Sequence, residues 1–285
     1  MVIDFHTHIG HLGRTVEHVL AHMDAHGVQQ AVVLPIDGTS FENERWPSAE
    51  ALDEASLYPD RLIPFFHVDP RRPGAVERIR RAYRMGAKGF GEHKIKLPVD
   101  APESQMVYRL CAELGWPVLL HFQYGVFNFN VAAFEQVLRA HPDTVFIGHA
   151  RSWWANISGD ATTDHEAAEY DDYATGQVVP GGLIDRWLEE FPNCYGDLSA
   201  RSGFNALSRD PEFGREFVHR HATKLLWASD CGCRDGAGDH GEFGQKTCWA
   251  ARCLPLLREF CSAAEYEAIT SGNARRVLRM DGSTP

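Results

Sequence analysis

Short apolar runs recur along the whole chain, and segments with helical periodicity separate them. Apolar runs of roughly four to eight residues, rich in β-branched side chains and bounded by turn-forming residues, are typical of buried strands. Residues 118–120 and 225–227 are apolar at every position, as in strands that are covered on both faces of a sheet. The runs predict strands at residues 2–5, 30–34, 62–66, 87–91, 117–121, 144–148, 194–197 and 224–228.

Amphipathic segments lie between these runs, and their spacing of apolar positions predicts helices. Strands that alternate with helices form parallel sheets, so eight such units predict a (β/α)8 TIM barrel of the α/β class. The 285 residues suit one barrel of about 250 residues, so we expect a single domain over residues 1–285, with a helical tail at 262–280 that closes one end. The expected helices are 16–26, 75–84, 103–114, 131–140 and 183–190.

The net charge of −11 narrows the choice of partners, because a nucleic-acid backbone needs a basic protein face. We therefore expect a small-molecule substrate and no nucleic acid. The seven cysteines are odd in number and spread along the chain, which indicates a reducing compartment rather than a disulfide framework. The sequence shows no signal-peptide pattern and no apolar stretch of roughly 18–20 residues, so we expect a cytoplasmic protein without a membrane partner.

Two histidines stand one residue apart at the end of the first predicted strand, in Asp-Phe-His-Thr-His at residues 4–8. Alternate side chains of a strand point to the same face, so His6 and His8 are expected to project together. Paired imidazoles are common ligands of zinc and of neighbouring divalent metals. The pair alone fits either a metal site or two histidines held by local hydrogen bonds.

Further histidines and carboxylates end other predicted strands. In barrels of this kind the chemistry gathers at the carboxyl ends of the strands. Isolated buried charges are costly, so their convergence on one rim favours a cation between them. The residues that end strands four to eight are Glu92, His121, His149, Asp197 with Ser199, and Asp230.

The ordered set His6-x-His8, His121, His149 and Asp230 resembles the amidohydrolase superfamily of metal-dependent barrel enzymes. More narrowly, it is similar to the amidohydrolase-related branch that includes aminocarboxymuconate-semialdehyde decarboxylase. The resemblance covers nearly the whole chain, from Ile-Asp-Phe-His at residues 3–6 to Gly-Asn-Ala-Arg-Arg-Val-Leu at residues 272–278. It implies a divalent ion, expected to be zinc, held by His6, His8, His121 and Asp230. Asp230 is also expected to take the proton of the activated water.

Two positions bear on whether one or two ions are held. Glu92, in Gly-Phe-Gly-Glu, is similar to a glutamate of TatD-like deoxyribonucleases that bridges two metals. We expect it to contact metal, with an ion pair to Lys94 or Lys96 as the alternative. His149 is expected to orient water and polarise the substrate, and a ligand role for a second metal is its alternative.

The loops after strands six and seven carry the expected substrate contacts. Arg151 and Arg201 suit bidentate recognition of a substrate carboxylate, and surface salt bridges are the alternative. Ser199 is expected to face the same pocket, and Trp153 to line it or to anchor its loop. Residues 152–182 are long, acidic and glycine-bearing, so they predict a lid or binding loop.

Two other groups of histidine and cysteine residues are weaker candidates for metal ligands. Cys231 and Cys233 follow Asp230 directly and suggest thiolate ligands. Because no second cysteine pair stands at zinc-binding spacing, a role in the shape of the loop is favoured. His18, His22 and His26 recur every four residues and share one helical face, which predicts a solvated or packing surface.

These expectations converge on a metal-dependent hydrolase that activates water to attack a small carbonyl compound, such as an amide, lactone or cyclic amide. The first alternative keeps the site and makes the protein a nonoxidative decarboxylase of a small carboxylic acid. A TatD-like nuclease is favoured only by Glu92, and a noncatalytic metal-binding scaffold would show no turnover. The substrate, the metal and the oligomeric state, a homo-oligomer included, stay open.

Overall fold

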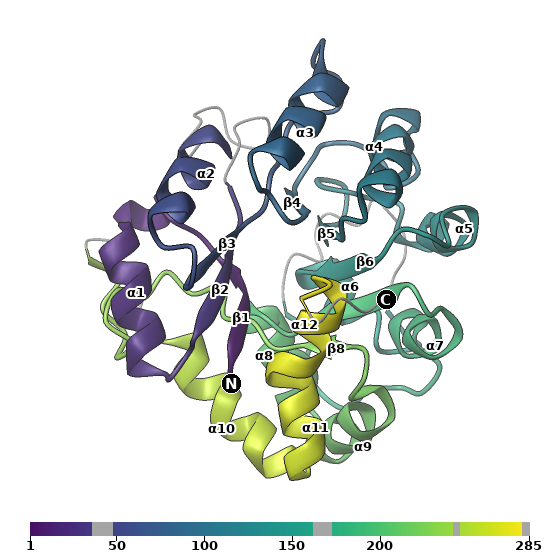
Figure 1. Cartoon of the computed structure of the whole chain (residues 1–285). Coiled ribbons are helices and arrows are strands. Elements are labelled where there is room, and N and C mark those ends of the chain that lie inside the picture. The colour runs from purple at the N-terminus through teal and green to yellow at the C-terminus, as the bar shows by residue number, and fades with distance from the viewer. Residues whose placement is uncertain (36–47, 162–172, 242–245, 281–285) are drawn as a thin grey trace.

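Parallel strands form the centre of the molecule and helices surround them (Figure 1). The computed structural model describes residues 1–35, 48–161, 173–241 and 246–280. Strands β1–β3 are hydrogen-bonded as one run and β4–β8 as a second run. The strands in the described ranges are β1 (Ile3–Thr7), β2 (Gln30–Val33), β3 (Leu62–Pro64), β4 (Phe90–His93), β5 (Val118–His121), β6 (Phe146–His149), β7 (Cys194–Asp197) and β8 (Leu225–Leu226).

Hydrogen bonds between the two runs close the sheet into a barrel. Phe66, just after β3, forms a parallel bridge with Phe90 of β4, and its amide donates to the carbonyl of Gly89 at 2.9 Å. At the other seam, the amide of Phe5 in β1 donates to the carbonyl of Trp227, next to β8, at 3.2 Å. The α/β barrel predicted from the sequence is therefore confirmed.

Local capping groups set the ends of several helices. The Thr15 side chain accepts a hydrogen bond from the backbone amide of His18 at the start of α1. Pro102 stands in the first turn of α4, and Gly115 ends that helix at a φ of 67°. The described helices are α1 (Val16–Ala25), α2 (Ser48–Leu57), α3 (Ala75–Arg84), α4 (Pro102–Leu114), α5 (Phe134–Ala140), α6 (Arg151–Ala155), α7 (Leu183–Glu190), α8 (Ala200–Ser208), α9 (Pro211–His221), α10 (Trp249–Phe260), α11 (Ala263–Glu267) and α12 (Asn273–Val277), with 3-10 turns at His11–Gly13 and Val131–Ala133.

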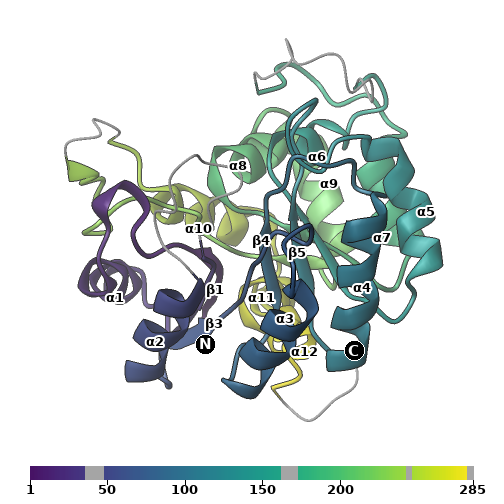
Figure 2. The ribbon, with the colours of Figure 1, turned by 90° about the horizontal axis from the view of Figure 1, so that it is seen from above.

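Alternation along the strands divides the core into two parts. Side chains such as Phe5 and Ile147 form one buried cluster, and Ala274 and Val277 of α12 belong to it. The opposite strand faces pack against the helices in a second, larger cluster. Figure 2 shows α12 and the N-terminus at one end of the barrel and α6 and α8 toward the other end. The tail therefore covers the end of the barrel that lies away from α6 and α8.

Several helices differ from the sequence prediction. The patterns did not predict α2, α6, α8, α9 or α10, and the expected tail helix is divided by a π-helical turn at Ala268–Gly272. In α8 and α9, glycine allows close packing: a Cβ on Gly203 would lie 2.3 Å from the backbone of Leu198, and one on Gly214 2.2 Å from the Leu207 carbonyl oxygen. Glycine lowers helix propensity, so packing rather than local sequence determines these helices.

The predicted lid or binding loop at 152–182 lies partly outside the described residues, because residues 162–172 are not described. Its beginning belongs to α6, and its role as a lid stays a prediction. Within the described ranges, none of the helices combines the length and the apolar character that a membrane crossing requires.

Candidate metal centre

His6 lies near the end of β1 and His8 directly after it, with their Nε2 atoms 3.1 Å apart. The Nδ1 of His8 donates to the carbonyl oxygen of Leu34 at 2.8 Å, and the Nδ1 of His6 donates to Oδ2 of Asp197 at 2.7 Å. With the ring protons on Nδ1, both Nε2 lone pairs face each other in a buried space. Such an arrangement needs a positive charge between the nitrogens, so this donor pair fits a divalent metal ion.

Glu92, at the end of β4, lies between two pairs of histidines. Its Oε2 is 3.5 Å from Nε2 of His8 and 4.0 Å from Nε2 of His6. Its Oε1 contacts Nδ1 of His121 and lies 3.8 Å from Nε2 of His149. Each carboxylate oxygen thus faces a different pair of imidazoles, as the expected metal contact of Glu92 requires.

Asp230, after β8, faces three of the same histidines. Its Oδ1 is 3.7 Å from Nε2 of His6 and 3.5 Å from Nε2 of His8, while Oδ2 is 3.6 Å from Nε2 of His149. The amide of Asp230 donates to the carbonyl of His6 at 2.8 Å, which fixes the chain at this point. Its side chain is 23% exposed, against 7% for Glu92, so Asp230 is the carboxylate that meets solvent.

The imidazole of His149, at the end of β6, is oriented through its other nitrogen. Its Nδ1 lies 2.9 Å from Oγ of Ser199 and 3.6 Å from Oδ2 of Asp197. Asp197 is fully buried and also accepts a hydrogen bond from the Ser199 amide at 2.8 Å. The sequence marked Asp197 only as a strand end, and its contact with His6 becomes visible in the structure.

The pKa values show which of these groups carry charge. Burial opposes charge on His6, but Asp230 and Asp197 outweigh it and raise the pKa of His6 to about 9. Without a bound ion, a proton on Nε2 of His6 therefore supplies the positive charge between the two rings, and a metal ion would replace that proton. Burial also opposes charge on the carboxylates, yet neighbouring His6 and His8 hold the pKa of Asp230 below its usual range. Burial lowers the pKa of His121 to about 3 and lowers that of His149, so both imidazoles are neutral and able to act as ligands.

Of the predicted substrate residues, Arg151, Arg201 and Ser199 lie near the loops around the site, whereas Trp153 lies in the core. Arg151 and Arg201, at the starts of α6 and α8, both lie over the ring of Tyr173, at 5.5 and 4.1 Å from its centroid. Ser199 reaches the site through His149. Trp153 is fully buried and stacks on Phe122, with ring centroids 5.3 Å apart, so the structure places it in the core between barrel and helices instead of at a pocket wall.

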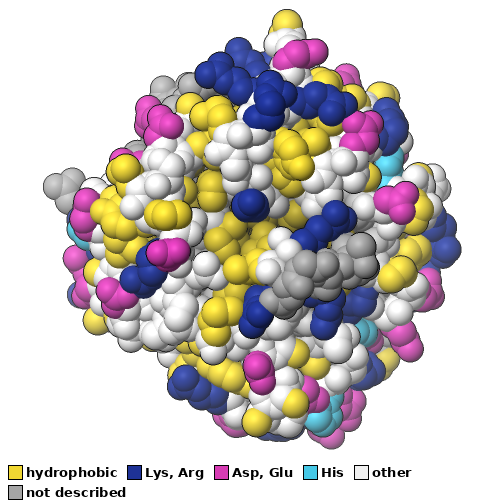
Figure 3. Space-filling model, in the orientation of Figure 1, with side chains coloured by type: hydrophobic (Ala, Val, Ile, Leu, Met, Phe, Trp, Pro, Cys, Tyr) yellow, Lys and Arg dark blue, Asp and Glu magenta, His cyan; other side chains and the backbone are white. Residues whose placement is uncertain are grey.

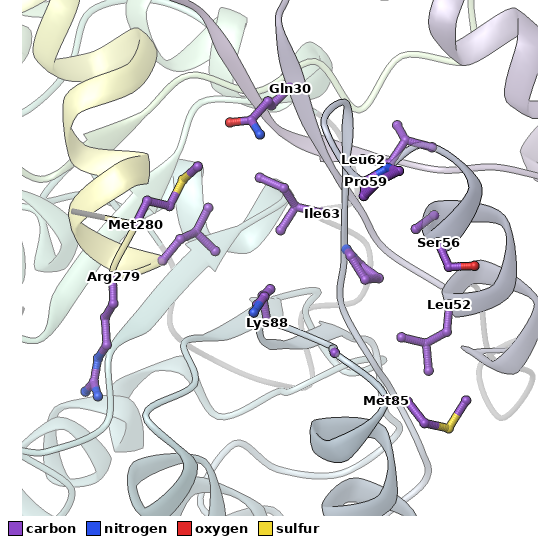
Figure 4. Close-up of a pocket in the computed structure, with 14 residues that line it drawn as sticks. Gln30, Leu52, Ser56, Pro59, Leu62, Ile63, Met85, Lys88, Arg279 and Met280 are labelled. Carbon is purple, nitrogen blue, oxygen red and sulfur yellow. The ribbon is translucent and has the colours of Figure 1, made fainter. Parts of the chain in front are cut away.

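A cavity of about 380 Å³ opens at the opposite end of the barrel (Figure 4). Gln30 at the start of β2, Lys88 before β4 and Met280 after α12 line it, so it lies at the amino-terminal ends of the strands. Figure 3 shows this end with apolar side chains around a central hollow. The metal-ligand candidates lie at the carboxyl ends, and the cavity is therefore separate from them.

Comparisons with known proteins agree with this architecture. A family model described as "Amidohydrolase" matches residues 3–280. No curated protein sequence matches the chain. Among solved structures, an uncharacterised TIM-barrel protein from Bordetella bronchiseptica is similar, with 17% identity, a TM-score of 0.68 and 99% of each chain covered.

Two further similar structures carry names that describe activities. One is a probable 2-pyrone-4,6-dicarboxylic acid hydrolase from Acinetobacter baumannii with citric acid bound; identity is 14%, the TM-score 0.61, and 97% of this chain and 98% of that chain are covered. The other is a dihydroxybenzoic acid decarboxylase from Polaromonas sp. JS666 with manganese and the inhibitor 2-nitroresorcinol; identity is 14%, the TM-score 0.57, and coverage 98% and 97%. Hydrolases and decarboxylases thus share this fold.

Proposed function

The chain belongs to the amidohydrolase family, and from that premise we propose that it is a metal-dependent hydrolase of small carbonyl compounds, such as amides, lactones or cyclic amides. One observation carries the proposal. The facing Nε2 atoms of His6 and His8, 3.1 Å apart, lie beside an ionised and partly exposed Asp230. This combination offers both a place for a cation and a base that water can reach.

His6, His8, Glu92 and Asp230 would hold a divalent ion, and His121 and His149 with the second oxygen of Glu92 could hold another. When bound, the ion would polarise the substrate carbonyl and favour ionisation of water. Imidazole and carboxylate donors suit zinc and also manganese, the metal bound in the Polaromonas decarboxylase. Since the Glu92 oxygens face different histidine pairs, Glu92 would have one oxygen available for each of two ions.

The chain's own residues then divide the proton transfers. Asp230 accepts the proton of the attacking water, and its lowered pKa keeps it ionised for that task. With a single ion bound, His149 is placed to stabilise the developing oxyanion, a role that requires the Ser199 hydroxyl to donate to Nδ1 so that Nε2 carries the proton. With two ions bound, Nε2 of His149 would be a metal ligand instead. Asp230 afterwards returns its proton to the leaving group.

Nonoxidative decarboxylation is the second candidate, and the arginine pair favours it. Arg151 and Arg201, at the starts of the helices that follow β6 and β7, both lie over the ring of Tyr173. These guanidinium groups suit a substrate carboxylate, which decarboxylation requires. They would equally bind the carboxylate of an acidic substrate that is hydrolysed. Carbon dioxide release from small carboxylic acids, with no hydrolytic product, would favour this reaction over hydrolysis.

Metal counting and turnover test the proposal together. We expect His6→Ala, purified without chelators, to lose about one equivalent of metal relative to wild type and to lose turnover of a panel of lactones and amides. Glu92→Ala should lose metal as well if two ions are bridged, and keep it if one ion is held by the other ligands. His219→Ala, at an exposed histidine paired with Glu265, is the matched control.

Asp230→Asn supplies the catalytic arm of the test. At saturating metal, kcat should fall by about 10²- to 10⁴-fold, because general-base assistance is lost. An active wild type with no bound or restorable metal would overturn the mechanism. Unchanged kcat in Asp230→Asn would exclude Asp230 as the base.

A further inference from the structure

A second group of histidines and cysteines lies in the loop between β8 and α10, which begins directly after Asp230. Three of its members, Cys231, Cys233 and His240, have ligand atoms within 4.8 Å of one another. All three side chains are buried, and the cysteines form no disulfide. The group contains sulphur and imidazole, whereas the candidate metal centre contains imidazole and carboxylate.

His240 has one nitrogen that lacks a partner. Its Nε2 donates to the carbonyl of Thr247 at 2.9 Å, which leaves Nδ1 as a lone pair. His240 is only 2% exposed, and its Nδ1 is buried without a hydrogen-bond partner. A Cβ built on Gly232, between the two cysteines, would lie 3.2 Å from it, so the lone pair faces the Cys-Gly-Cys turn. An unpaired buried acceptor in this position calls for a donor or a cation.

Cys248, just before α10, connects this turn to helix α1. Its Sγ lies 3.2 Å from Nε2 of His26 and 3.5 Å from Nε2 of His22. Its thiol also interacts with that of Cys231. Cys248 therefore forms a close group with His22 and His26 and meets the group of Cys231, Cys233 and His240 through the two cysteines.

Backbone amides donate to two of these sulphurs, and a buried arginine lies beside the Cys231 carbonyl. Without a bound ion, hydrogen bonds within the cluster and burial still raise the pKa of Cys231 and of Cys233, so a metal ion would have to displace their protons. The amide of Gly238 donates to Sγ of Cys233 at 3.0 Å, and that of Trp249 to Sγ of Cys231 at 3.4 Å. Arg14 is 1% exposed; its Nη1 donates to the carbonyl of Cys231 at 2.6 Å, while its Nε and Nη2 have no hydrogen-bond partner. Thiolates beside the guanidinium would complement its charge, as Asp4 does in part.

We propose that Cys231, Cys233, His240 and Cys248 bind a structural zinc ion, separate from the catalytic centre. Three thiolates and one imidazole are the donor types of structural zinc sites, and the absence of carboxylate from this set distinguishes it from His6, His8, Glu92 and Asp230. His22 and His26 contact Cys248 and position its sulphur. Binding releases the thiol protons to solvent, including the proton that Cys233 donates to Asp235.

Such an ion would stabilise the chain directly beyond Asp230. Cys231 follows Asp230 in sequence, and its carbonyl is held by Arg14. Asp230 has a φ of 40°, a conformation that side-chain-bearing residues rarely adopt without support from their surroundings. The zinc would fix the loop that carries this aspartate to the rim of the barrel.

Cobalt(II) substitution tests the site, because cobalt bound to thiolate gives an intense near-ultraviolet charge-transfer band that imidazole and carboxylate ligands do not give. We expect this band in wild type and, unchanged, in the double variant His6→Ala/His8→Ala, so that the result is independent of the proposed function. Cys233→Ser should abolish or weaken the band and lose about one equivalent of zinc. Cys261→Ser, at a free thiol outside the cluster, should change neither.

The direct titration of wild type keeps the test informative where a variant fails to fold. A wild-type protein with no charge-transfer band and no zinc, whose seven thiols are all reactive after denaturation, would overturn the site. A band that survives His240→Ala unshifted but disappears in His22→Ala would overturn the assigned fourth ligand. A charge-transfer band in wild type, together with rapid zinc loss in Cys233→Ser, would support the proposed zinc site.

Discussion

At the scale of single residues, Asp197 has a role that its position at a strand end did not disclose. It accepts the Nδ1 proton of His6 at 2.7 Å and so directs Nε2 of His6 toward His8. A carboxylate behind a ligating histidine fixes the ring and raises its basicity. We therefore regard Asp197 as a positioning residue for the candidate metal centre.

Asp197→Asn should weaken metal binding by about 10- to 100-fold, because the amide cannot hold the His6 tautomer in the same way. Titration of the metal-free protein against a chelating dye measures the change. Asp185→Asn removes a carboxylate of similar size that contacts Arg220 and His221 between outer helices, and it should leave the affinity unchanged. Equal affinities in wild type and Asp197→Asn would show that Asp197 does not orient His6.

At the scale of elements, Glu135 joins two neighbouring helices of the outer ring. Its Oε2 accepts from Arg186 at 2.7 Å and from Trp187 at 3.2 Å, both on α7, and its Oε1 accepts from Arg139 of its own helix α5 at 2.8 Å. Arg186 and Arg139 lower the pKa of Glu135 from its ordinary 4.5 to about 2. The lowered pKa means that the ionised form stabilises the folded chain.

Glu135→Gln should reduce the free energy of unfolding by about 1 kcal/mol at pH 7. The contribution of an acid with a lowered pKa is complete above its unfolded pKa of about 4.5 and declines as pH falls toward about 2. Urea unfolding at pH 7 and pH 3 should therefore show a smaller difference between variant and wild type at pH 3. Glu113→Gln, in the exposed pair with Arg80, should have little effect at either pH, and a pH-independent difference for Glu135→Gln would contradict the pairing.

At the scale of the whole molecule, the C-terminal tail completes the barrel. Asn273, at the start of α12, is fully buried, and its Nδ2 donates to the carbonyls of Ala222 and Leu225, each at 2.7 Å. Ala274 and Val277, further along α12, belong to the same apolar cluster as Phe5 of β1. The last helix is therefore bonded to β8 and packed against the centre of the fold.

Asn273→Ala should lower the free energy of unfolding by about 2–3 kcal/mol, because two buried carbonyls lose their donor. Chemical denaturation of wild type and variant under identical metal conditions measures this loss. Arg276→Ala, on the same helix but with only long contacts, should change stability by less than about 0.5 kcal/mol. Similar effects of both substitutions would mean that Asn273 does not tie the tail to the barrel.

The sequence by itself determined the barrel and the positions of the rim residues. Strong local periodicity gave residues 75–84 and 183–190 the same bounds as α3 and α7, and the run at 194–197 those of β7. In a parallel barrel every strand ends at the same rim, so residues such as His6 and Asp230 were predictable as neighbours without coordinates. The chemical type of these side chains and their order along the chain sufficed to indicate a metal centre.

Tertiary structure alone decided the contacts between segments distant in sequence. Trp153 was predicted either to line a pocket or to anchor its loop, and the structure packs its ring against Gly148, where a Cβ would lie 2.2 Å from the indole. The convergence of strands and loops decides which oxygen of Glu92 faces which histidine pair. It also brings Cys248 to His22, more than 200 positions away in the sequence. Local patterns record a residue's face and strand, whereas distances across the barrel are set by packing of the whole chain.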